Sequence, residues 1–577
     1  MADVSASRKS LWKILVPAAV VLVAVLVAGT FYFRSRQHTA HVLTEKDTIV
    51  LADFSNSTGD AVFDDTLKTA LSVSLNQSPF LNVLSENKVA STLKLMSRPA
   101  DTKLTPEVTR ELCQRADSKA YLAGSIASLG SQYVLGLKAV NCQSGDPLAE
   151  EQLTAASKEK VLDALGEAAS KLRTELGESL ATVQKLDVPL SEATTSSLEA
   201  LKAYSLGQKA WNEKGPAAAL PYHQRAIELD PNFAMGYNAV ANDYFSLGEL
   251  GRASDYSTRA FQLREHASER EKLTITANYY QNATGEQDKA AQTFQEEIES
   301  YPRDYRAHLG LGNAYGGQGQ YEKATESYRQ GLGLAPDSAG PYADLGNSLL
   351  SLQQFDEARQ IIHEGQARQL DNAVLHSALY AIAFLGSDSA AIAEQQQWFA
   401  GKPDYENVGL ALDSDTVAYG GHLGKARELT KRAVDSAIRA DSKESGAISQ
   451  GNDAIAQAAY GNPAEARQSA DEALKLAPTS QGVEVEAALA FALAGDTARA
   501  ASLAQDLAKR FPLDTQMQSL WLPAIQAQSA LDRKKPAAAL TALQATVPPV
   551  ELGQIAFVTN ISCLYPTYIH GEAYLEA

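Results

Sequence analysis

The chain has 577 residues, of which 45% are apolar and 21% are charged, as in ordinary folded proteins. A single hydrophobic core does not organise a chain of this length, so we expect several units. Its net charge is −18, from 51 basic and 69 acidic residues. Nucleic-acid binding needs a basic surface, so we expect no nucleic-acid partner. The three cysteines and nine histidines show no zinc-type spacing, so we expect no metal and no cofactor.

An apolar segment lies close to the amino terminus. Residues 14–33 (ILVPAAVVLVAVLVAGTFYF) contain no charge, and a helix of this length spans roughly the 30 Å of a bilayer core. We predict a transmembrane helix over 14–33, a cytoplasmic tail over 1–13 and a linker over 34–47. The basic residues on the two sides give a weak positive-inside bias, towards single-pass insertion in the inner (cytoplasmic) membrane with the rest of the chain extracytoplasmic. A cleaved signal peptide is the alternative, although its apolar core is usually shorter.

Residues 48–185 carry the pattern of a small α/β domain. Buried-strand patterns occupy 48–54 and 80–84, and two alternating segments, 119–128 and 132–141, are typical of a hairpin. An edge strand is expected over 147–155. Helices are expected over 61–77, 87–96, 106–116 (with Thr105 as N-cap) and 158–185.

Two of the cysteines, Cys113 and Cys142, fall in this domain. Outside the cytoplasm they could form a disulfide. Two buried thiols are an equal alternative, because a sequence does not place two Cα atoms within bonding distance.

After a linker over 186–199, helical hairpins continue to the end of the chain. The clearest is 305–338, where two helices flank Gly319, the small residues Gly312 and Ala324 permit close helix packing, and Pro336 ends the second helix. We assign repeats one to five to 200–372, with a short insertion at 268–270, divergent hairpins to 373–446, further repeats to 447–549 and a partial last repeat to 550–577. Ending on half a hairpin suggests a truncated chain or a partner that covers the exposed face. The predicted fold class is mainly α: an α-α superhelical solenoid preceded by a transmembrane helix and a small α/β domain.

The spacing of Leu311, Gly312, Tyr315, Tyr321, Ala324, Tyr328 and Pro336 resembles the tetratricopeptide repeat (TPR). The segments TIVLADFSNSTGD, FLNVLS, AYLAGSIASLG and YVLGLKAVNCQSGD resemble the small domain related to the amino-terminal domain of TolB, which occurs beside TPR arrays in bacterial signalling proteins. The whole order looks like the carboxy-terminal half of bacterial transmembrane serine/threonine kinases. That resemblance implies a sensor portion without its kinase domain.

Catalytic motifs are missing from the sequence. There is no GxSxG, HExxH, P-loop or dinucleotide fingerprint, and no kinase glycine-rich loop or HRD. The triplet Ala52-Asp53-Phe54 is followed by Ser55, not by the glycine of a kinase DFG motif. We therefore expect no enzyme activity.

A binding function has more support. In a TPR hairpin the first helix lines the concave groove, where amide side chains pair with an extended peptide and aromatic ones supply apolar contact. We predict a protein or peptide ligand there and leave a homo-oligomer or a partner kinase open. The predicted groove residues are Tyr204, Gln208, Trp211, Asn238, Asn242, Phe245, Tyr279, Asn313 and Asn347.

The sequence thus predicts a membrane-anchored TPR protein that mediates protein–protein interaction as the extracytoplasmic sensor or scaffold of a signalling system. One alternative is a periplasmic assembly factor released by signal cleavage. Another is a fragment of a receptor-type serine/threonine kinase.

Overall fold

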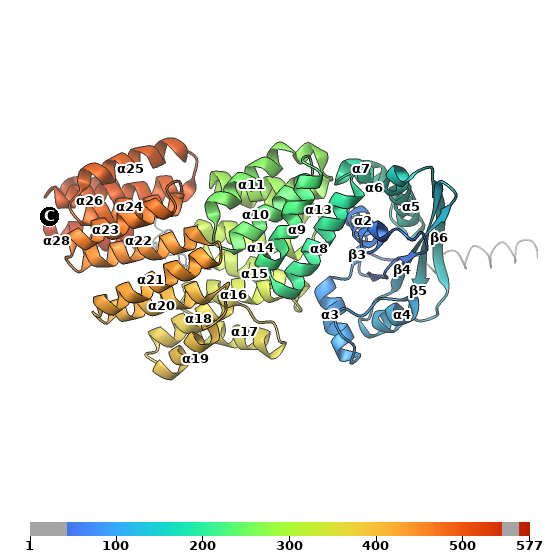
Figure 1. The fold of residues 1–577 in the computed structure, drawn as a ribbon, viewed down its shortest axis with the longest axis horizontal. Coiled ribbons are helices and arrows are strands. Elements are labelled where there is room, and N and C mark those ends of the chain that lie inside the picture. The colour runs from blue at the N-terminus through green and yellow to red at the C-terminus, as the bar shows by residue number, and fades with distance from the viewer. Residues whose placement is uncertain (1–42, 545–564) are drawn as a thin grey trace, which may run out of the picture. The chain divides into compact units, whose positions relative to one another are not determined.

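The computed structural model describes residues 43–544 and 565–577 (Figure 1). The predicted tail, the predicted membrane helix and most of the first linker therefore lie outside the described residues. Among the described helices, none is both long and apolar enough to cross a membrane. The chain forms two compact units. The first consists of the described residues up to Gly59, Ser74–Leu84 and Asp101–Asp187, and the second of Asp60–Val73, Ser85–Ala100 and the described residues from Val188 onward.

A mixed sheet is the centre of the first unit. Its strands are β1 (Thr48–Leu51), β2 (Ser55–Asn56), β3 (Asn82–Val83), β4 (Ala120–Leu129), β5 (Gln132–Asn141) and β6 (Pro147–Ala155). The order is β3-β1-β4-β5-β6, and β2 also pairs with β4. The pairs β3–β1 and β1–β4 are parallel, whereas β4–β5 and β5–β6 are antiparallel. Leu129 pairs with Gln132 across a tight turn in which Gly130 has a φ of 64°, a conformation that favours glycine.

Short helices precede and follow the hairpin. They are η1 (Ala61–Phe63), α2 (Thr66–Asn76), α3 (Glu86–Leu95), α4 (Pro106–Arg115), η2 (Lys158–Lys160), α5 (Val161–Glu175) and α6 (Leu180–Leu186). Thr105 is the N-cap of α4, as predicted, and its hydroxyl accepts a hydrogen bond from the Val108 N–H. Helix α4 packs on β1 and β4, and α5 packs on β5 and β6 through an almost fully buried apolar face.

The prediction of one continuous helix over 158–185 was wrong. The chain leaves the helix after α5, Gly177 adopts a φ of 115°, and α6 begins behind Ser179, whose hydroxyl accepts the Thr182 N–H at 3.1 Å. The break falls at two local signals, Gly177 and the N-cap Ser179, and contacts of Arg173 accompany it.

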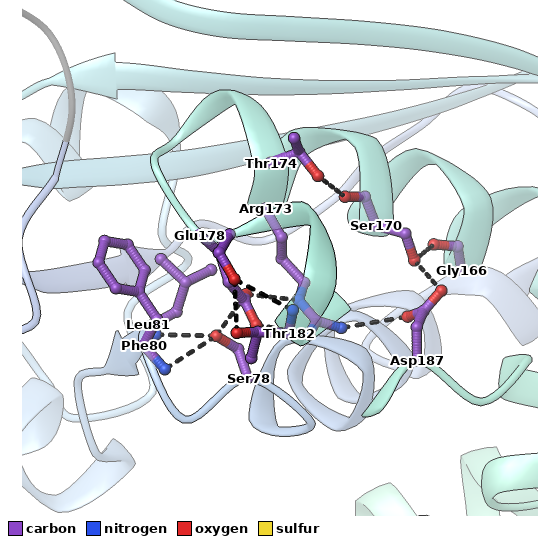
Figure 2. A network of polar contacts seen from close by, with 11 residues as sticks. Ser78, Phe80, Leu81, Gly166, Ser170, Arg173, Thr174, Glu178, Thr182 and Asp187 are labelled. Atoms are coloured by element: carbon purple, nitrogen blue, oxygen red, sulfur yellow. Dashed lines mark hydrogen bonds and ion pairs between the residues drawn. The ribbon is translucent and has the colours of Figure 1, made fainter. Parts of the chain in front are cut away.

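Arg173 is completely buried at the end of α5 (Figure 2). Its Nε and Nη2 donate to the two carboxylate oxygens of Glu178 at 2.9 Å, and its Nη1 donates to Asp187 at 3.1 Å. The Ser78 hydroxyl donates to Glu178 at 2.6 Å. The chain turns back after α5 so that the Glu178 and Asp187 carboxylates reach one guanidinium group.

The structure joins Cys113 of α4 and Cys142, which follows β5, in a disulfide with a Cα–Cα distance of 5.9 Å. Both cysteines are fully buried. The bond ties the last turn of α4 to the end of the central hairpin.

From α8 onward the second unit consists of paired helices (Figure 1). A short helix, α7 (Leu190–Ala193), lies inside the predicted linker. The described residues then form ten hairpins and a last single helix: α8 (Leu198–Lys214) and α9 (Pro216–Leu229), α10 (Ala234–Ser246) and α11 (Leu250–Gln262), α12 (Glu269–Tyr279) and α13 (Gln287–Ser300), α14 (Tyr305–Gly317) and α15 (Tyr321–Leu334), α16 (Ala339–Ser351) and α17 (Phe355–Ala367), α18 (Ala373–Leu385) and α19 (Ser389–Phe399), α20 (Glu406–Tyr419) and α21 (Leu423–Arg439), α22 (Lys443–Ala459) and α23 (Pro463–Leu476), α24 (Gln481–Leu493) and α25 (Thr497–Arg510), α26 (Leu522–Asp532) and α27 (Pro536–Leu543), then α28 (Tyr565–Glu576).

Three shorter elements interrupt this series: η3 (Arg264–His266), η4 (Tyr280–Thr284) and η5 (Met517–Trp521). The residues 268–270, expected to be an insertion, begin α12 instead. Ser268 and Glu271 form a reciprocal capping box there, with Ser268 Oγ accepting the Glu271 N–H and the Glu271 carboxylate accepting the Ser268 N–H. The segment 373–446 forms two complete hairpins, α18–α19 and α20–α21.

The core of the array consists of buried apolar clusters that each extend over more than one hairpin. One buried apolar cluster joins residues of α15, α16, α17 and α18, and another extends from α22 to α28. Each hairpin therefore depends on its neighbours for burial, which is the property expected of a repeat array.

Candidate peptide-binding groove

The first helices of the hairpins form one layer of the array, which we call the inner layer. From α10 to α28, each first helix contacts the first helix of the next hairpin, whereas second helices contact mainly their own partner and the following first helix. Because the first helices approach one another more closely, the array curves with the inner layer on its concave side. Ligand-facing side chains are expected on that layer.

All nine predicted groove residues lie in inner-layer helices. Three of their amides are already engaged inside the array. Asn238 is 2% exposed and accepts a hydrogen bond from the Asn278 amide at 3.0 Å. Asn347 donates to the Ala343 carbonyl at 3.0 Å, and Asn313 accepts the Tyr328 hydroxyl at 2.8 Å. Asn238 and Asn347 are buried: the Asn238 amide joins α10 to α12, whereas the Asn347 amide bonds within its own helix α16.

The aromatic members of the set are half-buried. Tyr204 packs edge-on against Phe233 with ring centroids 5.2 Å apart, and burial raises the pKa of its hydroxyl. Tyr279 stacks on Phe261 at 4.0 Å. The remaining four members are half-buried in the same layer: Gln208, Trp211, Asn242 and Phe245.

Four of the predicted residues share one position in their hairpins. Asn242, Tyr279, Asn313 and Asn347 each lie six residues before the positive-φ residue that turns the chain into the second helix, at Gly248, Gly285, Gly319 and Gln353. In the seventh hairpin the turn residue is Gly421, and the equivalent position is Asp415. Asp415 is exposed on α20. Asp415 was not among the predicted groove residues because no repeat register was assigned to 373–446, although the glycine pair 420–421 marks the turn six residues after it.

Several carboxylic acids of the inner layer lack the usual aqueous environment. Burial raises the pKa of Asp344 to about 7 and that of Glu271 to about 7. At neutral pH these groups are therefore partly protonated, and a nearby positive charge would ionise them.

One polar contact joins distant parts of the array, and we call it the clasp. Glu249, the residue before α11, accepts the Glu444 N–H at the start of α22 at 2.7 Å. In return, the Glu444 carboxylate accepts the Gly251 N–H at the start of α11 at 2.9 Å, and also the Ser480 hydroxyl at 2.5 Å. Each glutamate thus caps the amino end of the other's helix, where unpaired N–H groups and the helix dipole favour a carboxylate.

A second contact of the same kind lies further along the chain. The Thr515 N–H donates to the Gly285 carbonyl at 3.0 Å, and the Gln516 side chain donates to the Gly317 carbonyl at 3.0 Å. Together with the clasp it holds the turns of the second, third and fourth hairpins against the hairpins that begin with α22 and α26. Hydrogen bonds therefore join hairpins that lie far apart in the sequence at two places.

A metal centre does not form among the residues that the structure describes, which hold no group of three or more histidine, cysteine, aspartate or glutamate side chains arranged for an ion.

Comparison with known proteins agrees with the repeat geometry. Residues 317–382 match the family model described as "Tetratricopeptide repeat". No curated protein matches the sequence. Yeast Tom70 is similar in fold at 13% identity and a TM-score of 0.38, covering 65% of this chain and 96% of its own. A Rap protein, solved in complex with competence and sporulation factor, has 13% identity and a TM-score of 0.33 and covers 42% of this chain and 76% of its own.

The carboxy-terminal domain of LpoB from Salmonella enterica is another similar structure, at 12% identity and a TM-score of 0.19, covering 21% of this chain and 90% of its own. At these scores the structural similarities carry no argument about function. The family match shows tetratricopeptide repeats within residues 317–382, and the helix pairs on both sides continue the same alternation of first and second helices. Repeats of this class are scaffolds for protein–protein interaction.

Proposed function

We propose that this chain is a membrane-anchored TPR protein whose inner layer binds an extended segment of a partner protein in the extracytoplasmic space, as the sensor or scaffold of a signalling system. Peptide binding is supported by the row of half-buried aromatic and amide side chains on consecutive inner-layer helices. Such side chains offer large apolar contact and paired hydrogen bonds to a peptide backbone at low entropic cost.

The location and the signalling role rest on other observations. The uncharged segment 14–33 is long enough to anchor the chain. The Cys113–Cys142 disulfide supports an oxidising compartment, since such bonds are rare in the cytosol. The signalling role rests on the resemblance of residues 48–185 and of the array to the sensor half of bacterial transmembrane kinases.

Site-specific photocross-linking of the full chain in cells tests the binding part. A photoreactive residue at Asn242, on the inner layer, is expected to capture a partner protein. The matched control is Glu322, exposed on the second helix α15, where no capture is expected. Equal capture at both positions, or none at either, would contradict the use of the inner layer.

Fusions at the carboxyl terminus of the full chain test the location. Alkaline phosphatase activity in a membrane fraction that resists carbonate extraction is the expected result. Fluorescence of a cytoplasmic reporter alone would show that the orientation is the reverse of the proposed one. A mature amino terminus near residue 30 would favour the released assembly factor, and an in-frame kinase sequence upstream would favour the receptor fragment.

A further inference from the structure

A groove of about 570 Å³ separates the second helices α21 and α23. Helix α22 contacts both of them and forms the floor (Figure 1). Three side chains of α21, spaced four and three residues apart, line one wall: Arg427, Lys431 and Val434. The wall formed by α23 contains the carboxylates of Glu465 and Glu472, and all four charged side chains are exposed. The groove therefore has a basic wall and an acidic wall.

The opposite charges of these two walls do not pair with each other. Neither basic side chain of the α21 wall forms a hydrogen bond or an ion pair with a residue that the structure describes. Between other second helices of the array, an arginine closes the corresponding space. Arg329 of α15 donates to Glu357 of α17 at 2.6 Å. Arg499 of α25 pairs with Asp471 of α23. The α21–α23 groove carries the same charges without such a bridge, so both walls remain open to a ligand of complementary charge.

Glu472 on the acidic wall is held in place by neutral donors. The Gln450 amide of α22 donates to one carboxylate oxygen at 3.1 Å, and the Gln468 amide, one turn earlier on α23, donates to the other at 2.9 Å. Amide donors orient a carboxylate without cancelling its charge. Because Glu472 is already oriented, a cation in the groove can pair with it at little further cost in side-chain entropy.

One end of the groove is apolar and closed. A Cβ atom at Gly446 of α22 would lie 3.4 Å from the Cα atom of Val434 and 3.5 Å from Cδ2 of Leu476. The three helices therefore converge at this glycine, and the half-buried side chains of Val434 and Leu476 line the groove beside it. Lys475, next to Leu476 in the sequence, also lines the groove. A ligand that fills the groove thus meets apolar surface at this end and opposite charges along its length.

The stretches of this chain that the structure does not describe lack the complementary charges. Residues 545–564 contain one charged residue, Glu551, and no basic one. Residues 1–42 contain one acid, Asp3, in the predicted cytoplasmic tail and therefore across the predicted membrane helix from the array. Neither stretch offers an acidic edge together with a basic edge. The occupant that fits the charges is therefore another protein.

We propose that the α21–α23 groove is a second docking surface, which binds one α-helix of a partner protein. That helix carries acidic side chains on its edge towards α21, basic side chains on its edge towards α23, and an apolar side chain at the Val434–Leu476 end. A helix suits the groove because the wall residues recur at helical intervals, and a helix packed between two others presents its own side chains at the same intervals. A scaffold with this surface holds a second partner outside the inner layer.

The experiment is a selection from a displayed library of single α-helices, randomised at their surface positions, on the full chain in detergent. Helices selected by the natural protein are expected to carry acidic residues along one edge and basic residues along another. Their binding is expected to weaken as salt is added, because charge pairs at an exposed surface are screened.

Charge reversal on α21 makes the test specific. Arg427→Glu combined with Lys431→Glu is expected to lower the affinity about tenfold or more, and replacing the acidic edge of the selected helix by lysines is expected to restore it. The matched control is Lys425→Glu combined with Arg432→Glu, two exposed residues of the same helix that do not line the groove. This control changes the net charge equally and is expected to leave the affinity unchanged.

A variant on the other wall keeps the test decisive if the α21 variant does not melt like the natural protein. Glu465→Lys combined with Glu472→Lys is expected to reject the selected helix and to accept one whose basic edge is replaced by glutamates.

Three outcomes would overturn this docking surface. The first is a selection without binders, or binders with equal affinity for the natural protein and for the α21 charge-reversal variant. The second is a cross-link from a photoreactive residue at Lys431 to residues 1–42 or 545–564 of the same chain. The third is a dimer that the α21 variant dissociates, which would show a second copy in the groove. Cross-linking at Asn242 reports on the inner layer separately, so none of these outcomes decides the proposed peptide binding.

Discussion

Single buried side chains decide the backbone path in the first unit. Arg173 and Glu178 are both buried, and their bidentate pair replaces the water that each charge has lost. Replacing both members of such a buried ion pair by apolar residues changes the free energy of unfolding little. Removing one partner is costly, because the other charge stays buried and unpaired.

We therefore expect Arg173→Met to destabilise the α5–α6 segment by about 3–5 kcal/mol. Hydrogen exchange of the amides in 161–187 measures the effect locally, and faster exchange is expected there. The control is Lys171→Met on the same helix, whose pair with Glu167 is exposed and whose loss is expected to change nothing. Unchanged exchange in the Arg173 variant would show that the network does not hold the turn.

The disulfide gives a second prediction for single residues. Alkylation of the denatured full chain with a maleimide is expected to modify one thiol, that of Cys563, if Cys113 and Cys142 are bonded in cells. Replacing both by alanine is expected to lower the free energy of unfolding of the α/β unit by roughly 3–4 kcal/mol, as for a loop of 29 residues. Three reactive thiols before reduction would contradict the bond.

Pairs of helices in the array approach closely where one contributes a glycine. Gly312 of α14 faces the ring of Tyr328 in α15, and a Cβ atom there would meet that ring. Gly310 meets Phe294 of the preceding hairpin in the same way. The prediction that Gly312 permits close packing agrees with this arrangement. A ring on one helix fills the space that a glycine on its neighbour leaves.

We expect Gly312→Ala to destabilise the fourth hairpin, α14–α15, by roughly 1–3 kcal/mol, because the added methyl group overpacks the contact with Tyr328. Gly333→Ala on α15 is the matched control. It is exposed and has nothing near its Cβ position, so alanine is expected to stabilise the helix by up to ~1 kcal/mol. Thermal unfolding of the two variants checks the opposite signs, and shifts of the same sign would contradict this account.

The array as a whole depends on contacts between segments far apart in the sequence. The clasp joins Glu249 and Glu444, and both side chains are buried. Burial raises the pKa of Glu249 to about 7; the hydrogen bond from the Glu444 N–H and the Arg252 charge oppose this shift, and the carboxylates of Glu444 and Asp441 add to it. The pKa of Glu444 is raised as well, mainly by burial. The clasp therefore holds most firmly when at least one of the pair is protonated.

The sign of the pH dependence follows from these directions. An acid whose pKa is raised in the folded state contributes its full stability below the unfolded value of 4.5 and loses it as the pH rises through about 7. For Glu249 the loss is roughly 3 kcal/mol between pH 4.5 and pH 8. The clasp is thus expected to weaken as the solution becomes alkaline.

Spin labels at Leu250 and Lys443, in a background without Cys563, measure the opening. A single short distance is expected at pH 5.5, and an additional longer one at pH 8. Glu249→Gln keeps the oxygen that accepts the Glu444 N–H and removes the titration, so it is expected to show the short distance at both values. Identical distributions for the natural protein at both pH values would contradict a clasp controlled by protonation.

The amino-acid sequence by itself determined the local elements. Alternation in 119–141 predicted the hairpin, and the spacing of small residues, turn glycines and prolines predicted most of the helix pairs, because each of these signals acts within a few residues. Tertiary structure decided what depends on distant partners. The carboxylates of Glu178 and Asp187 meet Arg173 only in the folded chain, and the burial of Asn238 and Asn347 requires neighbouring helices. The clasp between Glu249 and Glu444 joins helices that lie far apart in the sequence, and no local pattern records such a contact.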